Sequence, residues 1–174
     1  MIDDNALTHL RTEEGVSFYR FHARLFRYFY TSMADYEGLR SRMVRETIDF
    51  LRGRYQVIYM AVEDQLIGYG IITRGGGRNR FCTRADAVLC SLYVDPSHRG
   101  KGYANVLVRV LSEIAVEYAE GIFEYIKPDN IPSVKAAEAN GLQKMGNAAF
   151  FGRLKLIKRD PAGPLVIYKK EITH

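Results

Sequence analysis

The chain of 174 residues contains no tryptophan, only two cysteines and only four histidines. Two cysteines cannot build a disulfide framework, and Cys82 and Cys90 form no CxxC pair or other metal-ligand spacing. The histidines are scattered along the chain. The sequence therefore predicts neither a metal site nor a fold that depends on disulfide bonds.

Long hydrophobic runs are absent as well. The uninterrupted apolar stretches span only a few residues, far short of the roughly 20 that a transmembrane helix needs. The N-terminal stretch MIDDNALTHL lacks the basic region and the apolar core of a signal peptide. We therefore expect a cytoplasmic protein that has no membrane partner. Hydrophobic residues make up 47% of the chain and charged residues 26%, which predicts a single globular domain over residues 1–174.

The charge of the chain is +5, but blocks of basic residues are missing. A spread-out excess of this kind does not favour a nucleic-acid-binding protein, because such proteins gather their basic residues on one face or along one helix. No aromatic RNA-binding strand and no recognition helix is recognisable either. A small polyanionic ligand explains the charge equally well, and we expect no nucleic-acid partner.

Hydrophobic periodicity predicts a mixed α/β protein. The expected strands cover residues 6–11, 55–63, 66–73, 87–94, 122–126, 149–157 and 165–172. The expected helices cover residues 13–30, 39–51, 103–119 and 131–139, and residues 74–86 form a loop. The near-continuous apolar run 87–94 is typical of a strand that is covered on both faces, as in a parallel sheet. With the helix and the strand that follow, it predicts a right-handed βαβ unit.

The segment VDPSHRGKGYANVL, residues 94–107, joins this strand to its helix. Gly100 and Gly102 permit a tight turn and a close approach of a ligand to the backbone. The N–H groups of the first helical turn, the helix dipole and the side chains of Arg99 and Lys101 all favour an anion there, most naturally a diphosphate. No acidic residue caps the helix, as expected if the ligand does so. The alternative is a plain turn in which the glycines only relieve strain.

Two segments resemble a known family. Arg99-Gly-Lys-Gly-Tyr-Ala104 is similar to the R-x-x-G-x-A pyrophosphate loop of the GNAT N-acetyltransferases, and KPDNIPSVKAAEANGL, residues 127–142, resembles that family's second conserved block. The closing LVIYKKEI looks like its last strand. The resemblance covers roughly residues 55–172. It implies an α/β (α+β) GNAT fold: a mixed, mostly antiparallel sheet of six to seven strands, about four flanking helices, and a central parallel pair of strands that separate to hold acetyl-CoA.

The resemblance also implies a cofactor site. Acetyl-CoA would be the cosubstrate, its pantetheine and thioester lying along one strand and its diphosphate on the loop. The residues implied for the pantetheine and thioester are Leu92, Tyr93 and Val94. Those implied for the diphosphate are Arg99, Gly100, Lys101, Gly102, Tyr103 and Ala104. Asn130 and Ser133 are implied as further cofactor contacts.

The implied reaction is direct attack of a primary amine on the thioester, so no covalent enzyme intermediate is needed and Cys90 is expected to be a core residue. Many relatives place a tyrosine seven residues after the asparagine, as the acid toward the departing thiolate, but this position is Ala137. In a subgroup that modifies ribosomal-protein N-termini, a serine three residues after the asparagine is proposed for that role, which points to Ser133. A serine in a first helical turn is also a common cap.

The general base is equally unsettled in the sequence. Some relatives carry a carboxylate five residues before the asparagine, where this chain has Tyr125. Glu124 lies one residue earlier and should face the opposite side of its strand, together with Ile122 and Ile126. A charge on that apolar face is unusual enough to make Glu124 a catalytic candidate beside Tyr125 and Ser133. The alternative is a polar group that reaches solvent or a buried partner.

The acceptor is expected to be an amine of low pKa. Holding a lysine-like amine neutral at pH 7 costs roughly 4.6 kcal/mol, but an α-amine only about 1.4 kcal/mol. An α-amine or an amino sugar is therefore favoured over a protein lysine. The aromatic segment 17–30 and Arg74, Arg78, Arg80 and Arg84 are candidates to face an acidic acceptor, with a core and a solvated surface as their alternatives. Two other interpretations stay open: an acyl-CoA sensor without activity, and a homodimer.

Overall fold

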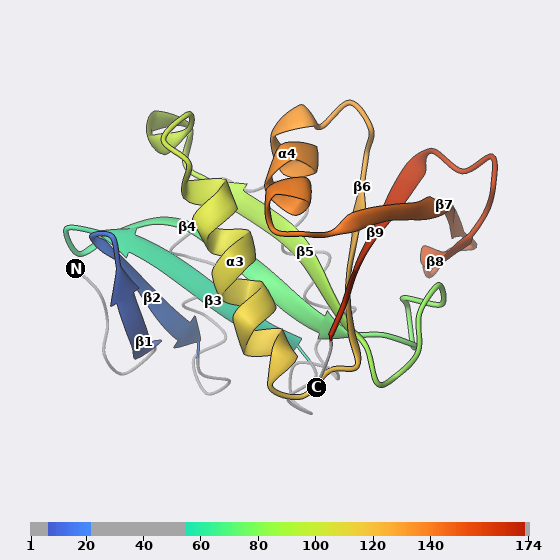
Figure 1. Cartoon of the computed structure of the whole chain (residues 1–174), viewed down its shortest axis with the longest axis horizontal. Coiled ribbons are helices and arrows are strands. Elements are labelled where there is room, and N and C mark those ends of the chain that lie inside the picture. The colour runs from blue at the N-terminus through green and yellow to red at the C-terminus, as the bar shows by residue number, and fades with distance from the viewer. Residues whose placement is uncertain (1–6, 22–54, 173–174) are drawn as a thin grey trace.

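The computed structural model describes residues 7–21 and 55–172. Their strands form one nine-stranded sheet in the order β1-β2-β3-β4-β5-β6-β9-β7-β8 (Figure 1). The strands are β1 (Leu7–Glu13), β2 (Val16–Phe21), β3 (Tyr55–Val62), β4 (Gln65–Arg74), β5 (Ala87–Val94), β6 (Gly121–Ile126), β7 (Gln143–Phe151), β8 (Leu156–Arg159) and β9 (Leu165–Glu171). The helices are α3 (Tyr103–Val116), α4 (Ile131–Ala139) and the short 3₁₀ helix η2 (Pro96–His98). The mixed α/β architecture predicted from the sequence is confirmed.

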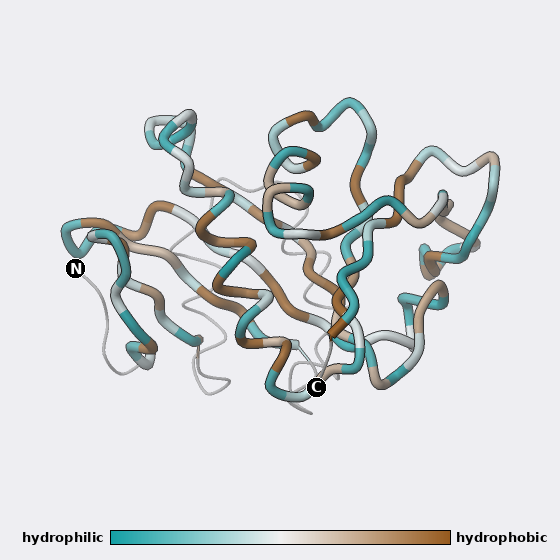
Figure 2. The backbone as a smooth tube through the Cα atoms, viewed as in Figure 1, coloured by the Kyte–Doolittle hydropathy of each residue, from teal (hydrophilic) through white to brown (hydrophobic). Residues whose placement is uncertain are grey.

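Helices α3 and α4 lie on one face of the sheet (Figure 1). Helix α3 packs its apolar stripe on β4, β5 and β6. Figure 2 shows hydrophobic segments alternating with hydrophilic ones along this helix. Leu107, Val110 and Leu111 of this stripe are fully buried against strand residues such as Ile72 and Leu89. Burial of apolar surface at roughly 25 cal/mol per Å² fixes the helix on the sheet. None of the helices in the described residues is long and apolar enough to span a membrane.

The opposite face of the sheet carries two further apolar clusters. One is rich in tyrosine and includes Tyr55, Tyr59 and Tyr69 of β3 and β4. The other contains Phe81 from the loop after β4 and Phe123 from β6, together with residues of β7, β8 and β9. Because apolar side chains cover both faces of β5, this strand reads in the sequence as a near-continuous hydrophobic run.

The pairing of β5 with β6 is parallel, and every other pairing among the described strands is antiparallel. Helix α3 connects the two parallel strands, which confirms the βαβ unit. Helix α4 covers residues 131–139, as the sequence predicts, with Asn130 as its N-cap.

Three expectations from the sequence need correction. Residues 16–21 form strand β2 and not the start of a helix, because Glu14 and Gly15, both at positive φ, close a tight hairpin with β1. The predicted strand 149–157 is instead the end of β7, a turn and β8. The sheet has nine strands and not six to seven. The predicted helix 39–51 and residues 22–30 lie outside the described residues.

A β-bulge distorts β5 at Ser91. Tyr69 pairs with Tyr93 and Ile71 with Cys90, so that Gly70 alone stands opposite two residues of β5. Ser91 has φ of 54°, which an L-residue rarely adopts. A Cβ on Gly70 would lie 2.4 Å from Leu111 Cδ1, so glycine lets α3 pack closely on β4 beside the bulge.

We expect Gly70→Ala to destabilise the protein by about 1–3 kcal/mol, because the added methyl group overpacks this contact. Leu111→Ala should cost about 2–5 kcal/mol through the cavity that it creates. In the double variant the methyl group enters the vacated space, so the combined loss should be smaller than the sum. Urea unfolding of the four proteins measures the coupling, and strictly additive losses would contradict this account of the contact.

Candidate functional site

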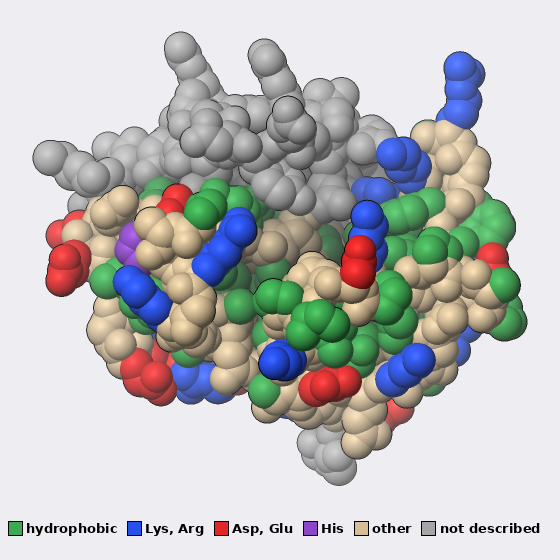
Figure 3. Space-filling model, turned by 90° about the horizontal axis from the view of Figure 1, so that it is seen from above, with side chains coloured by type: hydrophobic (Ala, Val, Ile, Leu, Met, Phe, Trp, Pro, Cys, Tyr) green, Lys and Arg blue, Asp and Glu red, His purple; other side chains and the backbone are tan. Residues whose placement is uncertain are grey.

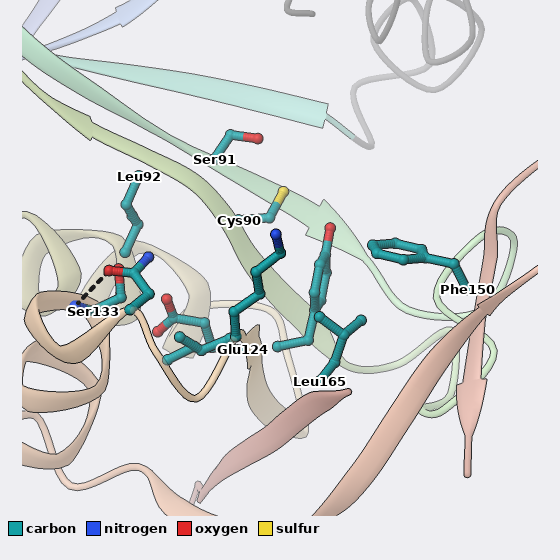
Figure 4. A pocket seen from close by; sticks show the side chains of 11 residues that line it. Cys90, Ser91, Leu92, Glu124, Ser133, Phe150 and Leu165 are labelled. Carbon is teal, nitrogen blue, oxygen red and sulfur yellow. Dashed lines mark hydrogen bonds between the residues drawn. The ribbon is translucent and has the colours of Figure 1, made fainter. Parts of the chain in front are cut away.

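The parallel strands β5 and β6 separate halfway along their length. They pair only where residues 87–89 meet residues 122–124, although both strands continue beyond this point. The gap opens into a pocket of about 240 Å³ (Figure 4). Its lining consists of Cys90, Ser91, Leu92, Glu124, Tyr125, Ile126, Lys127, Asn130, Ser133, Phe150 and Leu165. The pocket thus lies beyond the carboxyl ends of the paired segments, where open α/β sheets usually bind ligands.

The pocket has a helical side and an opposite side. Leu92 and Ile126 pack with the cluster beneath α3 and α4, whereas Cys90 and Tyr125 pack with the clusters of the other face. Figure 4 shows the Glu124 carboxyl group on the side of Ser133 and Leu92, and Phe150 and Leu165 on the other. A ligand that fills the gap can therefore be reached from both faces of the sheet.

At the bulge β5 diverges from β6. Residues Tyr93 and Val94 pair with β4 on one side, while β6 no longer pairs with them on the other. The Ser91 hydroxyl group is buried and has no hydrogen-bond partner within the described part of the chain. The edge of β5 that faces the gap, which β6 no longer covers, can therefore contact a bound ligand.

Beyond Val94 the chain forms the glycine-containing loop. Asp95 caps η2 by accepting a hydrogen bond from Ser97 N at 2.9 Å, and Arg99 Nε donates to Val94 O at 3.0 Å. These contacts hold the loop at the end of β5, where Gly100 and Gly102 both have positive φ.

The start of α3 is open to solvent. Gly102 is its N-cap in the left-handed conformation, no side chain caps the helix, and no acidic residue occupies its first turn. A Cβ built on Gly102 would meet nothing within 4 Å, and Arg99, Lys101 and Gly102 are exposed. The free N–H groups and the dipole of α3 therefore face solvent next to two cationic side chains, which suits an anionic ligand.

Helix α4 is anchored beside this loop. Asn140 at its C-terminal end donates hydrogen bonds to the backbone carbonyl and the side-chain oxygen of Asn105 in α3, the former at 3.1 Å and the latter at 2.6 Å. At the other end, Asn130 Oδ1 accepts from Ser133 N at 3.4 Å. Asn130 thus caps α4, and Ser133 lines the pocket.

Glu124 is the buried acid of the pocket, with an exposed fraction of 3%. Its Oε2 atom has no hydrogen-bond partner in the described part of the chain. Burial raises the pKa of Glu124 to about 8, because the charged form loses its hydration. At neutral pH this carboxyl group is therefore largely protonated and able to donate a proton.

Tyr125 faces the other way, into an aromatic group. Its ring lies edge-on to Phe81 at 6.0 Å and to Phe150 at 6.3 Å between centroids. Phe150 is 43% exposed and forms part of the pocket wall. The opposite side of the pocket thus ends in an aromatic surface that is open to solvent.

Two basic segments meet next to this aromatic group. Neither residues 76–84 nor residues 143–159 contain an acidic residue. They are joined by hydrogen bonds from Ile157 N to Arg78 O at 2.8 Å, from Arg78 Nε to Lys155 O at 3.0 Å, and from Arg159 Nε to Phe81 O at 3.2 Å. We call this region the basic lobe; its exposed cations are Arg80, Arg84, Lys144, Arg153, Lys155, Lys158 and Arg159.

Hydrophobic and basic side chains gather on the right-hand side of Figure 3, over β7 and β8. Arg74, which the sequence grouped with these arginines, stacks instead on Tyr118 at 4.9 Å near the end of α3. It does not belong to the basic lobe. The aromatic segment 17–30 lies partly outside the described residues, and its residues 18, 19 and 21 are core residues.

Most of the predicted site residues come together. Leu92, Glu124, Tyr125, Asn130 and Ser133 line one pocket, and residues 99–104 form the adjacent loop and helix start. Sequence reasoning missed Phe150, Lys127 and the bulged Ser91, and it placed Cys90 in the core although it lines the pocket. Lys127 follows directly after a strand, which was an available signal; nothing in the sequence brings Phe150 to this place.

No group of three histidine, cysteine or acidic residues among those described could hold a metal ion. Cys82, which lies outside the pocket, is unsuited to nucleophilic chemistry. Burial, and to a smaller extent the charge of Asp86, raises the pKa of its thiol to about 12.

Comparison with solved structures gives the same fold. The ribosomal-protein α-N-acetyltransferase RimL, solved with coenzyme A, is similar with a TM-score of 0.67 at 12% identity over 95% of this chain and 98% of its own. The yncA protein of Salmonella typhimurium, solved with acetyl-CoA, has a TM-score of 0.60 at 17% identity over 92% and 96%. The spermidine N-acetyltransferase SpeG of Vibrio cholerae has a TM-score of 0.63 at 12% identity over 91% and 95%.

A sequence search finds no match among curated proteins. The model of the acetyltransferase (GNAT) family, by contrast, matches residues 17–142, which include the separated strands, the glycine-containing loop and α4. With the structural likeness, this match shows that the chain belongs to the GNAT acetyltransferase family.

Proposed function

We propose that the protein transfers an acetyl group from acetyl-CoA to a primary amine, in the cytoplasm. The observation that carries the proposal is the gap between β5 and β6, which opens a pocket directly beside the exposed N-terminus of α3. A long thioester with a diphosphate at one end fits this arrangement, since its anionic part and its acyl end need two adjoining sites. Solved relatives that contain acetyl-CoA or coenzyme A support the same reading.

The cofactor contacts follow from the two sites. Backbone N–H groups from Gly100 to Ala104 and the Arg99 guanidinium bind the diphosphate. The edge of β5 at residues 92–94, which β6 no longer covers, forms hydrogen bonds with the pantetheine. Asn130 and Ser133, at the start of α4, border the thioester end of the pocket.

The reaction is attack of the neutral amine on the thioester carbonyl. Backbone N–H groups of β5 at the gap stabilise the negative charge that develops on the carbonyl oxygen. The aromatic side with Tyr125 and Phe150 receives the acceptor, and the helical side with Ser133 and Glu124 borders the sulfur. Tyr125, Ser133 and Glu124 are the side chains placed to move protons in this step.

The acceptor is an α-amine or an amino sugar that carries an anionic group. Lys127 lines the pocket, the basic lobe continues beyond Phe150, and Glu124 is neutral at pH 7. A polyamine or a lysine-rich peptide would meet positive charge here, whereas a carboxylate or phosphate near the reacting amine would be attracted. A low-pKa amine also needs little help to lose its proton.

A sensor that binds acyl-CoA without turnover is the second candidate, because the tyrosine common among relatives is replaced by Ala137. The two candidates differ in one measurement. A transferase releases coenzyme A thiol only when acceptor is added, and a sensor binds acetyl-CoA but releases none.

For the cofactor site we expect Arg99→Ala to weaken acetyl-CoA binding by about tenfold, equivalent to about 1.4 kcal/mol, through loss of a charged hydrogen bond to the diphosphate. Calorimetric titration with acetyl-CoA measures the dissociation constant. Arg153→Ala removes the same charge from the β7–β8 turn and should leave binding unchanged. If wild type, Arg99→Ala and Arg153→Ala bound acetyl-CoA with equal affinity, the diphosphate would not bind at this loop.

For the acceptor we expect a hexapeptide amide with a free α-amine and three aspartates to be acetylated at least about tenfold more efficiently than its lysine counterpart at low salt. Thiol release gives kcat/KM for both peptides and for an amino sugar with and without a phosphate group. Lys127→Glu should narrow the difference between the peptides.

Lys135→Glu is the matched control, because Lys135 is exposed on α4 and does not line the pocket. Added salt should also reduce the preference, since it screens the attraction. A wild-type preference for the lysine peptide would overturn the anionic acceptor and leave the transferase class intact. If none of the acceptors caused thiol release although acetyl-CoA bound tightly, the result would favour the sensor.

A further inference from the structure

The chain lacks the usual proton donor but holds a buried acid under the same helix. Ala137 stands where many relatives carry a tyrosine, and its methyl group is fully buried in the cluster between α4 and the sheet. Glu124 lies on the face of β6 that belongs to this cluster, because Ile122 and Ile126, two residues away on each side, are members of it. The chain thus lacks the tyrosine proton donor but has the Glu124 carboxyl group on the same side of the sheet.

The surroundings of Glu124 are otherwise apolar. Its strand partners are Leu89 on β5 and Tyr168 on β9, both of which belong to the same cluster. A carboxyl group in this environment would normally be paired, yet Glu124 Oε2 has no hydrogen-bond partner in the described part of the chain. A buried acid that has an unpartnered oxygen and also lines the pocket is suited to act on a ligand there.

We propose that Glu124, in its protonated form, donates a proton to the departing coenzyme A thiolate and takes the place of the missing tyrosine. This inference rests on the proposed acetyltransferase function. The reason for this role is position: the carboxyl group lies on the side of Ser133 and Leu92, where the sulfur is expected, and the acceptor side with Phe150 lies across the pocket (Figure 4).

The proton balance of the step is complete. The neutral amine forms the N–C bond, the C–S bond breaks, and the sulfur takes its proton from the Glu124 carboxyl group. The proton that the nitrogen loses goes to solvent on the acceptor side. The Glu124 carboxylate then regains a proton from solvent when coenzyme A leaves, so the enzyme returns to its starting state.

A neutral carboxyl group fits the pH range of this step. Burial sets the pKa of Glu124 near 8, close to that of an ordinary thiol. The ionisable groups around it are Tyr168 opposite on β9, Glu138 on the exposed side of α4, and Lys127 at the pocket wall. Burial, then Glu138 and Glu124, raise the pKa of Tyr168 as well, which keeps that phenol neutral.

The test compares wild type with Glu124→Gln, which keeps the shape of the side chain but holds no acidic proton. Thiol release is measured with saturating acetyl-CoA and with each peptide and amino sugar of the panel described above. We expect kcat to fall by roughly 100-fold at pH 7, the lower range for loss of a general acid. Calorimetric affinity for acetyl-CoA should change less than about threefold. Glu138→Gln, the same change on an exposed neighbour, should match wild type.

The pH profile separates an acid from a base. The ratio of wild-type to Glu124→Gln kcat cancels the titration of the acceptor amine, which both proteins share. A proton donor predicts that this ratio falls as the pH rises through about 8. A general base predicts that it rises over the same range, and a merely structural role predicts a ratio that does not change with pH.

A stability measurement confirms that the variant folds and tests the buried neutral acid separately. Because the pKa of Glu124 is raised on folding, wild type loses stability as the pH rises from about 5 toward 8. Glutamine has no such titration, so the melting temperature of Glu124→Gln relative to wild type should increase over this range. A constant difference would contradict a neutral Glu124.

Each result has one meaning. A wild-type enzyme that releases thiol, with a Glu124→Gln variant of equal kcat or a rising ratio, overturns the donor role but leaves the acetyltransferase function in place. A wild-type protein that binds acetyl-CoA and turns over no acceptor of the panel overturns the proposed function, and the donor role with it. Three results together support the proposal: a wild-type to Glu124→Gln kcat ratio that falls with pH, a retained affinity of the variant for acetyl-CoA, and a melting temperature of the variant that rises relative to wild type with pH.

Discussion

The separation of β5 from β6 after three paired residues is the constraint on which the site depends. Closed pairing along both strands would fill the gap with backbone hydrogen bonds and leave no pocket. The bulge at Ser91 shifts the register of β5 just where its pairing with β6 ends, at Leu89. Gly70, the residue opposite the bulge, lets α3 pack close to β4 at the same place.

The gap also divides the chemistry of the site between the two faces of the sheet. On the helical side lie the start of α3, the capped start of α4 and the buried Glu124. On the other side lie Tyr125, Phe150 and the basic lobe. A group-transfer enzyme needs separate sites for donor and acceptor that meet at one atom. A gap through a sheet provides both sites with little rearrangement, because each face already has its own apolar cluster.

Sequence reasoning identified those parts that depend on local geometry. The apolar run 87–94 and the glycines of the loop each have a physical requirement that is visible within a few residues. Prediction from the sequence failed where the structure of a segment depends on contacts with residues far away in the chain. The strand at 16–21 carries aromatic residues on both faces, so its period resembles neither a helix nor a half-buried strand. Phe150 reaches the pocket only because β7 pairs with β9, and the Ser91 bulge is defined by the strand opposite.

The buried Glu124 destabilises the folded state near neutral pH, and the packing of the fold alone does not explain its presence. Its folded-state pKa of about 8 lies above the ordinary value, so folding becomes less favourable as the pH rises through the interval between them, by a few kcal/mol in order of magnitude. An isoleucine like its neighbours at 122 and 126 would avoid this loss. The burial that disfavours the carboxylate is also what keeps a proton on the acid at neutral pH, beside a sulfur that must gain one. The stability loss and the donor capacity therefore have a single physical origin, the low polarity of the helical side of the pocket.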